Sequence, residues 1–206
     1  GGKHFPGHGD TSVDSHHALP VVDHDRRRLD AVEWAPFRAA IAADVASLMT
    51  AHLMVPALDT DRRATFSSRV VTGELKQGLG FGGVVFSDDM GMKAATGDIS
   101  LPEASVAAIQ AGCDAVLLCN STVDEQWAAI EALIHAYERH DIPQTRVDDA
   151  FARQRRMKER FATSTTSASP ITSLVPTLDV VGCEAHQILA REMAAKETRP
   201  GRGAEL

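Results

Sequence analysis

Short apolar segments with strand character alternate with longer segments of helical periodicity along the first 162 residues. The strand-like segments are 3–5, 45–55, 83–87 and 115–119, and the helical segments are 29–41, 68–78, 102–111, 121–140 and 145–161. Alternation of this kind predicts βαβ units, because two parallel strands need a crossover connection, which is usually a helix. The chain is therefore expected to be an α/β protein with a buried parallel sheet.

Polar side chains follow each of the four predicted strands. His4, His52, Asp88 and Asn120 all stand at or just beyond the end of a strand. A (β/α)₈ TIM barrel gathers its active site at this end of its strands, and an open doubly wound sheet does the same. The pattern alone leaves both architectures open. A barrel needs about 250 residues, so four βα units correspond to about half of one.

The composition divides the chain into three parts. Residues 1–162 carry the βα units, 163–181 form a Ser/Thr-rich linker or loop, and 182–206 contain a terminal helix and a tail. The sequence begins with Gly1 and not with Met, and the first motif already begins at Lys3. We therefore expect that an N-terminal portion precedes it and that 1–162 are the C-terminal half of a catalytic barrel.

Charge and cysteine content narrow the function classes. The chain has 21 Lys and Arg against 28 Asp and Glu, a net charge of −7, and no basic stripe that could neutralise phosphates. No stretch reaches the roughly 18 apolar residues of a membrane span. Neither a nucleic-acid nor a membrane partner is expected. Three cysteines without a CxxC pair suit a reducing compartment, which predicts a cytoplasmic location.

Two groups of residues could carry catalysis. Asp88 and Asp89 directly follow a buried strand, so at least one carboxylate is expected to face the cavity at the strand ends. Such a carboxylate can attack an electrophilic carbon, although an Asp in this position can equally cap a helix. Asp14 and His16 are one residue apart in a Gly/Ser-rich loop, where the carboxylate could orient the imidazole and stabilise its protonated form.

Metal binding is an alternative role for the loop that contains Asp14 and His16. Possible ligands are frequent in and around this loop: His4, His8, Asp10, Asp14, His16, His17 and His24. Their spacing matches no compact zinc signature, and the Pro-Gly pair between His4 and His8 prevents both from standing on one helix face. We therefore predict no metal and no other cofactor, and a metal-dependent TIM-barrel hydrolase remains the rival interpretation.

Three motifs together resemble family 3 glycoside hydrolases, in particular bacterial β-N-acetylglucosaminidases that act on cell-wall fragments. The chain reads KHFPGHGDT from Lys3 to Thr11, DSH from Asp14 to His16, and FSDDMGM from Phe86 to Met92. Met90 stands where the family commonly has Leu. The resemblance covers about residues 3–160 and implies a TIM barrel.

The resemblance also implies roles for individual residues. Asp88 would be the nucleophile, His16 the general acid/base supported by Asp14, and Lys3 and His4 would bind hydroxyls of N-acetylglucosamine. The reaction implied is the retaining release of terminal β-N-acetylglucosamine from peptidoglycan fragments, with a muropeptide or oligosaccharide as the substrate. A non-enzymatic alternative is an inactive barrel fragment that self-associates through exposed sheet edges.

Overall fold

The computed structural model describes residues 1–11, 19–162 and 182–197. The chain divides into two compact units, Gly1–Thr163 and Ser164–Leu206. The predicted linker, 163–181, and the end of the tail, 198–206, lie outside the described residues. In the second unit the structure describes one helix, α7 (Glu184–Glu197).

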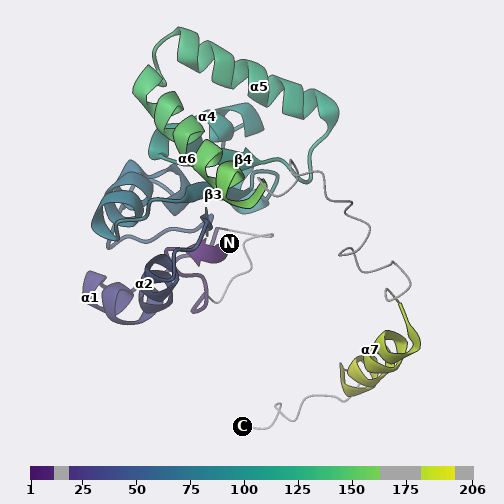
Figure 1. The fold of residues 1–206 in the computed structure, drawn as a ribbon. Helices are drawn as coiled ribbons and strands as arrows, with labels where there is room; N and C mark the ends of the chain where they lie inside the picture. Colours follow the sequence, from purple (N-terminus) through teal and green to yellow (C-terminus); the bar gives the residue numbers. More distant parts are fainter. Residues whose placement is uncertain (12–18, 163–181, 198–206) are drawn as a thin grey trace. The chain divides into compact units, whose positions relative to one another are not determined.

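Four parallel strands and the helices between them make up the first unit (Figure 1). In chain order its elements are β1 (Gly2–Phe5), α1 (Arg26–Arg28), η1 (Leu29–Glu33), α2 (Ala35–Ala42), β2 (Ser47–Thr50), η2 (Ala64–Phe66), η3 (Arg69–Gly78), β3 (Val84–Asp89), α3 (Lys93–Thr96), α4 (Leu101–Ala111), β4 (Ala115–Leu117), α5 (Val123–Glu138) and α6 (Gln144–Ala162). The predicted α/β class is confirmed.

The strand order distinguishes the two architectures that the sequence left open. The sheet runs β1-β2-β3-β4, and every neighbouring pair is parallel. A doubly wound sheet reverses its order at a switch point, whereas a barrel adds each strand beside the previous one. The observed sequential order is that of four consecutive barrel units.

The second strand is shorter than the sequence predicted. β2 ends at Thr50, whereas the apolar run continues to Val55. Beyond the strand the backbone bonds are irregular: the carbonyl of Leu53 accepts from Ala64, that of Val55 accepts from Leu58, and Met54 forms an isolated bridge with Val21. Leu53 and Val55 are nevertheless fully buried, so the run is apolar because it fills the core and not because it is all strand.

An aromatic cluster joins the first strand to the helices that follow it. Phe5, at the end of β1, stacks on Trp34 with ring centroids 6.0 Å apart and meets Phe37 edge-on at 5.2 Å. All three side chains are buried. This packing fixes the end of β1, and therefore the backbone that carries Lys3 and His4, against the helical layer.

Local sequence signals set the helix boundaries. The capping boxes Ser100–Glu103 and Thr122–Glu125 begin α4 and α5, with both reciprocal hydrogen bonds formed. Gly112 ends α4 at φ 124°, and a Cβ there would lie 2.4 Å from Thr72 Oγ1, so only glycine fits.

Helix α6 ties the N-terminal ends of the strands together. Arg153 donates from Nη1 to the carbonyls of Phe81 and Gly83, both at 2.9 Å, just before β3. Gln154 donates to the carbonyl of Asp114, just before β4. These bonds satisfy carbonyls that the sheet leaves open and hold the two strand starts at a fixed separation.

A buried ion network reinforces this end of the sheet. The Asp114 side chain is fully buried and accepts from Lys76 Nζ at 2.7 Å, from Arg146, and from the backbone of Val85 at 2.8 Å. Burial lowers the pKa of Lys76, and the Asp114 carboxylate opposes that shift. Asp114 thus connects α6, η3 and β3 through a single carboxylate.

Candidate active site

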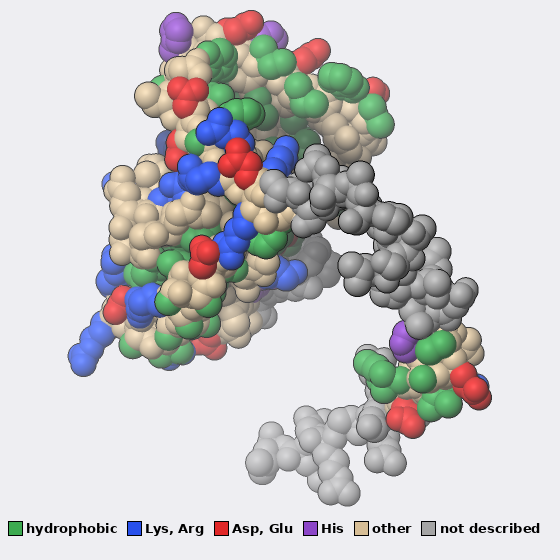
Figure 2. Space-filling view, viewed as in Figure 1, with side chains coloured by type: hydrophobic (Ala, Val, Ile, Leu, Met, Phe, Trp, Pro, Cys, Tyr) green, Lys and Arg blue, Asp and Glu red, His purple; other side chains and the backbone are tan. Residues whose placement is uncertain are grey.

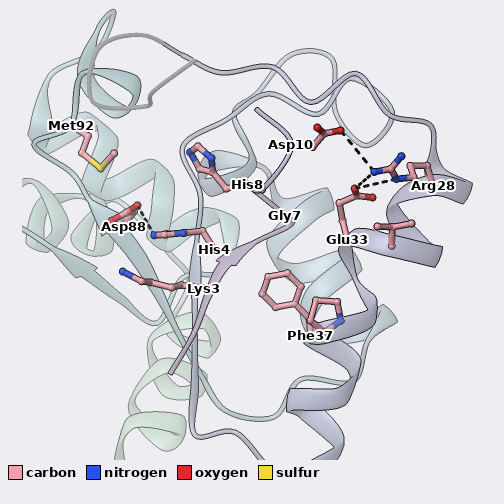
Figure 3. A pocket seen from close by; sticks show the side chains of 13 residues that line it. Lys3, His4, Gly7, His8, Asp10, Arg28, Glu33, Phe37, Asp88 and Met92 are labelled. Atoms are coloured by element: carbon pink, nitrogen blue, oxygen red, sulfur yellow. Dashed lines mark hydrogen bonds and ion pairs between the residues drawn. The ribbon is translucent and has the colours of Figure 1, made fainter. Parts of the chain in front are cut away.

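Asp88 and His4 meet at the C-terminal ends of β3 and β1 (Figure 3). His4 Nε2 lies 3.5 Å from Asp88 Oδ2, and the other carboxylate oxygen accepts from the backbone of Asp89 at 2.8 Å. The Asp88 side chain keeps about 20% exposure, enough for a substrate atom to reach it. The structure therefore brings together two of the predicted site residues from strands that are 84 positions apart in sequence.

These two side chains face a cavity of about 950 Å³. Its lining comprises Lys3, His4, Gly7, His8, Gly9, Asp10, Arg28, Val32, Glu33, Pro36, Phe37, Asp88 and Met92. Lys3 lies beside His4, and its amine points toward the same space as the carboxylate (Figure 3). Three of the five predicted site residues, Lys3, His4 and Asp88, thus line one cavity.

Burial controls the protonation state of His4. Partial burial lowers the pKa of His4, Lys3 and His8 lower it further, and Asp88 opposes the shift without reversing it. His4 is consequently neutral at pH 7, with one ring nitrogen that donates and one that accepts. A neutral imidazole in this position can donate to one hydroxyl group and accept from another.

Gly7 allows the loop after β1 to turn closely over η1. Its φ is 128°, and a Cβ would lie 2.8 Å from the Cβ of Glu33. The same turn is closed by a bond from the amide of Gly7 to the carbonyl of His4. Gly7, the first of the two glycines in the KHFPGHGDT motif, is therefore required by backbone geometry.

Asp89 is turned away from the cavity and has a structural role that the sequence did not reveal. It accepts three hydrogen bonds from Gly91 N, Cys119 N and Asn120 Nδ2, at 3.1, 2.9 and 2.6 Å. Burial alone would raise the pKa of Asp89, but these bonds together lower it below its ordinary value. The carboxylate thereby joins the end of β3 to the end of β4, beside the nucleophile candidate.

We expect Asp89→Asn to destabilise the fold by about 1–3 kcal/mol at neutral pH. The amide oxygen can still accept from Gly91 and Cys119, but the charge is lost and the amide nitrogen would face Asn120 Nδ2, which is itself a donor. A carboxyl whose pKa is lowered by folding stabilises above its unfolded pKa of about 4 and loses that contribution as pH falls through the folded value. The difference between wild type and variant should therefore shrink below pH 4. Urea unfolding at several pH values measures it. Asp88→Asn is the matched control and should change stability little.

His52 is a buried residue beneath the site. It follows β2, is 1% exposed, and its Nε2 lies 3.2 Å from the carbonyl of Asp89. Burial lowers the pKa of His52, with Asp88 opposing. The sequence analysis noted His52 as a polar residue at a strand end. The structure shows that it does not line the cavity. It supports the backbone next to Asp88 instead.

Asp14 and His16, the predicted acid/base pair, lie outside the described residues. The residues on either side of that segment are described. His24 Nε2 lies 2.7 Å from Asp10 Oδ2, and Arg28 Nη2 lies 3.8 Å from the same oxygen. The two ends of the segment are thus joined on the same wall of the cavity that carries Asp10 and Arg28 (Figure 3).

The histidine-rich loop was also the basis for the metal alternative. Among residues 1–11, 19–162 and 182–197, no three His, Cys, Asp or Glu side chains are arranged to hold a metal ion. His16, His17 and Asp14 are not among these, so the metal alternative is left to experiment.

The model of the glycosyl hydrolase family 3 N-terminal domain matches residues 1–157. The chain belongs to glycosyl hydrolase family 3. Its resemblance to that family, first indicated by the three motifs, is confirmed, and so is the barrel-type fold that the family shares. Within the family, the match includes β1 to β4 and so all of the described residues that meet around Asp88.

Individual relatives in family 3 agree with this assignment. A β-hexosaminidase of Methylobacillus flagellatus is 44% identical over 121 residues, which are 58% of this chain and 34% of that protein. Among solved structures, a family 3 β-N-acetylglucosaminidase from Paenibacillus sp. superposes with a TM-score of 0.80 at 39% identity, over 94% of this chain and 36% of that one. The structure of CbsA from Thermotoga neapolitana superposes with a TM-score of 0.70 at 35% identity, over 78% of this chain and 35% of that one.

This family 3 chain spans about a third of the length of those relatives. None of its described helices combines the length and apolar character needed to cross a membrane.

Proposed function

We propose that this chain carries the nucleophile and part of the sugar site of a retaining β-N-acetylglucosaminidase. The observation that carries the proposal is the position of Asp88. Its carboxylate stands at the end of a barrel strand, 3.5 Å from His4, and opens into the cavity in a family 3 chain. Its similarity to proteins named β-hexosaminidase and β-N-acetylglucosaminidase supports the substrate class.

The proposed reaction has two steps. In the first, Asp88 attacks the anomeric carbon while protonated His16 gives its proton to the glycosidic oxygen, and the leaving group departs. In the second, neutral His16 takes a proton from water, whose oxygen attacks the anomeric carbon and releases Asp88 and the sugar. Asp14 would orient His16 and raise its basicity, so an imidazole takes the place of the usual second carboxyl.

Lys3 and His4 supply the proposed contacts to the sugar. Both line the cavity beside Asp88, and a neutral His4 can donate to one hydroxyl while accepting from another. The proposed substrate is a terminal β-N-acetylglucosamine on a muropeptide or another oligosaccharide, within peptidoglycan recycling. The cytoplasmic location indicated by the cysteine content remains a prediction.

Covalent trapping tests the proposal directly. A fluorinated N-acetylglucosaminyl fluoride should form an ester that turns over slowly, because the ring fluorine destabilises the oxocarbenium-like transition state. Mass spectrometry of the digested protein should find the sugar on the peptide containing Asp88. An ester on any other residue removes the nucleophile assignment, and hydrolysis that stops with a chelator and returns with added zinc favours the metal alternative.

The role of His16 has its own test. We expect His16→Ala to lower kcat for a chromogenic N-acetylglucosaminide by about 10²–10⁴-fold, the usual contribution of a positioned acid/base group. The loss should be smaller for a substrate with an acidic phenol as the leaving group, which needs no protonation in the first step. Equal losses for both substrates would show that His16 does not protonate the leaving group. His135→Ala, on α5, is the matched control.

A further inference from the structure

His52 is a polar side chain in the interior of the first unit. Many Lys, Arg, Asp and Glu side chains lie at the surface, as Figure 2 shows around α6, where water solvates them. His52 is only 1% exposed, and its ring packs on that of Phe66 with the centroids 6.2 Å apart. An imidazole in such a place costs free energy unless its hydrogen bonds offset the loss of water.

One ring nitrogen of His52 is hydrogen-bonded and the other is not. Nε2 lies 3.2 Å from the carbonyl oxygen of Asp89, so this nitrogen carries the ring proton and donates it. Nδ1 is buried and has no hydrogen-bond partner among the described residues. Burial lowers the pKa of His52, and Asp88 and the backbone of Asp89 oppose this shift without reversing it, so the ring is neutral at pH 7. A phenylalanine would fill the same space without an unpaired nitrogen, so the bond to Asp89 is what distinguishes the imidazole.

The carbonyl of Asp89 lies where β3 has left the regular ladder. The last register pair between β2 and β3 is Met49–Phe86. On the other side, β3 advances three positions from Phe86 to Asp89 while β4 advances only two. β3 therefore has one extra residue opposite β4, which makes this stretch a β-bulge. A bulge next to an active site re-aims a side chain, and this one includes Asp88.

Side chains replace backbone hydrogen bonds on both sides of the bulge. On the β4 side the amide of Leu117 donates to Ser87 Oγ at 3.0 Å, and Ser87 is fully buried. On the β2 side His52 donates to the carbonyl of Asp89. Two buried side chains thus hold the backbone before and after Asp88, whose carboxylate faces the cavity (Figure 3).

We propose that His52 is a positioning residue for Asp88. By donating to the Asp89 carbonyl in place of a strand neighbour, the imidazole fixes the bulge in β3 and aims the Asp88 carboxylate at the cavity, with Ser87 as its counterpart on the β4 side. The proposal rests on the proposed function, because the aim of Asp88 matters to catalysis only if Asp88 is the nucleophile. A displacement of about 1 Å in a reacting group can cost about 10²-fold in rate, so a bond one residue away can control the reaction.

The pKa of His4 reports the orientation of Asp88 without any assay of hydrolysis. Asp88 raises this pKa in opposition to burial, so a carboxylate turned away from His4 should lower it further. NMR titration of the 206-residue chain measures it, with the His4 signal assigned by its loss in His4→Gln. Asp88→Asn gives the value without the carboxylate charge. We expect His52→Phe to shift the His4 pKa by about half or more of the change in Asp88→Asn.

Matched variants separate the hydrogen bond from the packing. His52→Gln can place its amide nitrogen where Nε2 lies and should keep the His4 pKa near the wild-type value. Ser87→Ala removes a single oxygen and should lower that pKa, which keeps the test decisive where His52→Phe does not fold. Val71→Ala in the core side of η3 is the control for lost stability and should leave the pKa unchanged. A wild-type His4 pKa in Ser87→Ala and in the folded His52 variants overturns the proposal, as does an equal shift in His52→Gln and His52→Phe.

Kinetics give a second readout. Per folded molecule, His52→Phe should lower kcat for a chromogenic N-acetylglucosaminide by about 10–10²-fold and change KM by less than about twofold, because Lys3 and His4, the proposed sugar contacts, remain in place. His52→Gln should recover most of kcat. Equal kcat in wild type and His52→Phe would mean that His52 only fills the core. If the wild-type chain hydrolyses nothing while His52→Phe shifts the His4 pKa, the proposed function fails and the positioning of Asp88 by His52 stands.

Discussion

Replacing Asp88, the proposed nucleophile, by alanine is expected to lower kcat for an aryl N-acetylglucosaminide by about 10⁴-fold or more, the scale of loss when a covalent nucleophile is removed. The reason is geometric. Asp88 is the carboxylate at the end of β3 that reaches the cavity, while its neighbour Asp89 is held by three donors on the far side. Asp89 cannot take over without losing those bonds.

Added azide should identify the mechanism in this variant. The small anion fits the space left by the carboxylate and should restore turnover, giving a glycosyl azide whose configuration is opposite to the retained one that the proposed mechanism gives the wild-type product. Asp44→Ala is the matched control, because Asp44 is 82% exposed and pairs with Arg160 on α6. Wild-type activity in Asp88→Ala, or equal losses in both variants, would contradict the assignment.

Replacing Asp114 by alanine will destabilise the chain by about 3–5 kcal/mol. Asp114 is the buried anion between Lys76 and Arg146, whose side chains are only 6% and 12% exposed. Without it, two buried cations face each other with Asp149 as the remaining partner. A loss of this size is a large fraction of the 5–15 kcal/mol by which typical domains are stable.

Urea unfolding at pH 7 measures this effect as a shift in midpoint with an unchanged slope. Asp141→Ala is the control, because Asp141 is half exposed and pairs with Arg139 on the surface, where an ion pair contributes at most about 1 kcal/mol. Asp114→Asn should fall between the two, since it keeps the shape and one acceptor but loses the charge. A loss below about 1 kcal/mol for Asp114→Ala would show that the network does not support the fold.

The sequence predicted those features that depend on local pattern. The sequence patterns located all four strands and the longer helices, though not the short elements α1, η2 and α3, and the motifs located Lys3, His4 and Asp88, which the structure places around one cavity. These predictions were correct because the burial of one face of a strand or helix requires apolar residues at a regular spacing in the sequence.

Features that depend on contacts between distant residues were not predictable. The spacing of the strands left their order open, and only the resemblance to family 3 implied the sequential order of a barrel. The role of Asp89 depends on donors about 30 residues away. The run 45–55 was read as one strand because an apolar stretch looks the same in a strand and in a core loop. His52 was noticed as a polar residue at a strand end, but its burial beneath the site follows from packing that no spacing reveals.

The hydrogen bonds from α6 to the residues that precede β3 and β4 affect which substitutions the fold can tolerate. Its bonds to Phe81, Gly83 and Asp114 hold the sheet at the end opposite to Asp88, and they are made to backbone carbonyls that no substitution removes. Exposed side chains around the cavity can therefore be exchanged with little effect on the frame. A library that randomises His8 and the half-exposed Val32 should yield mostly folded proteins, and so allow selection for new glycosides without first adding stability.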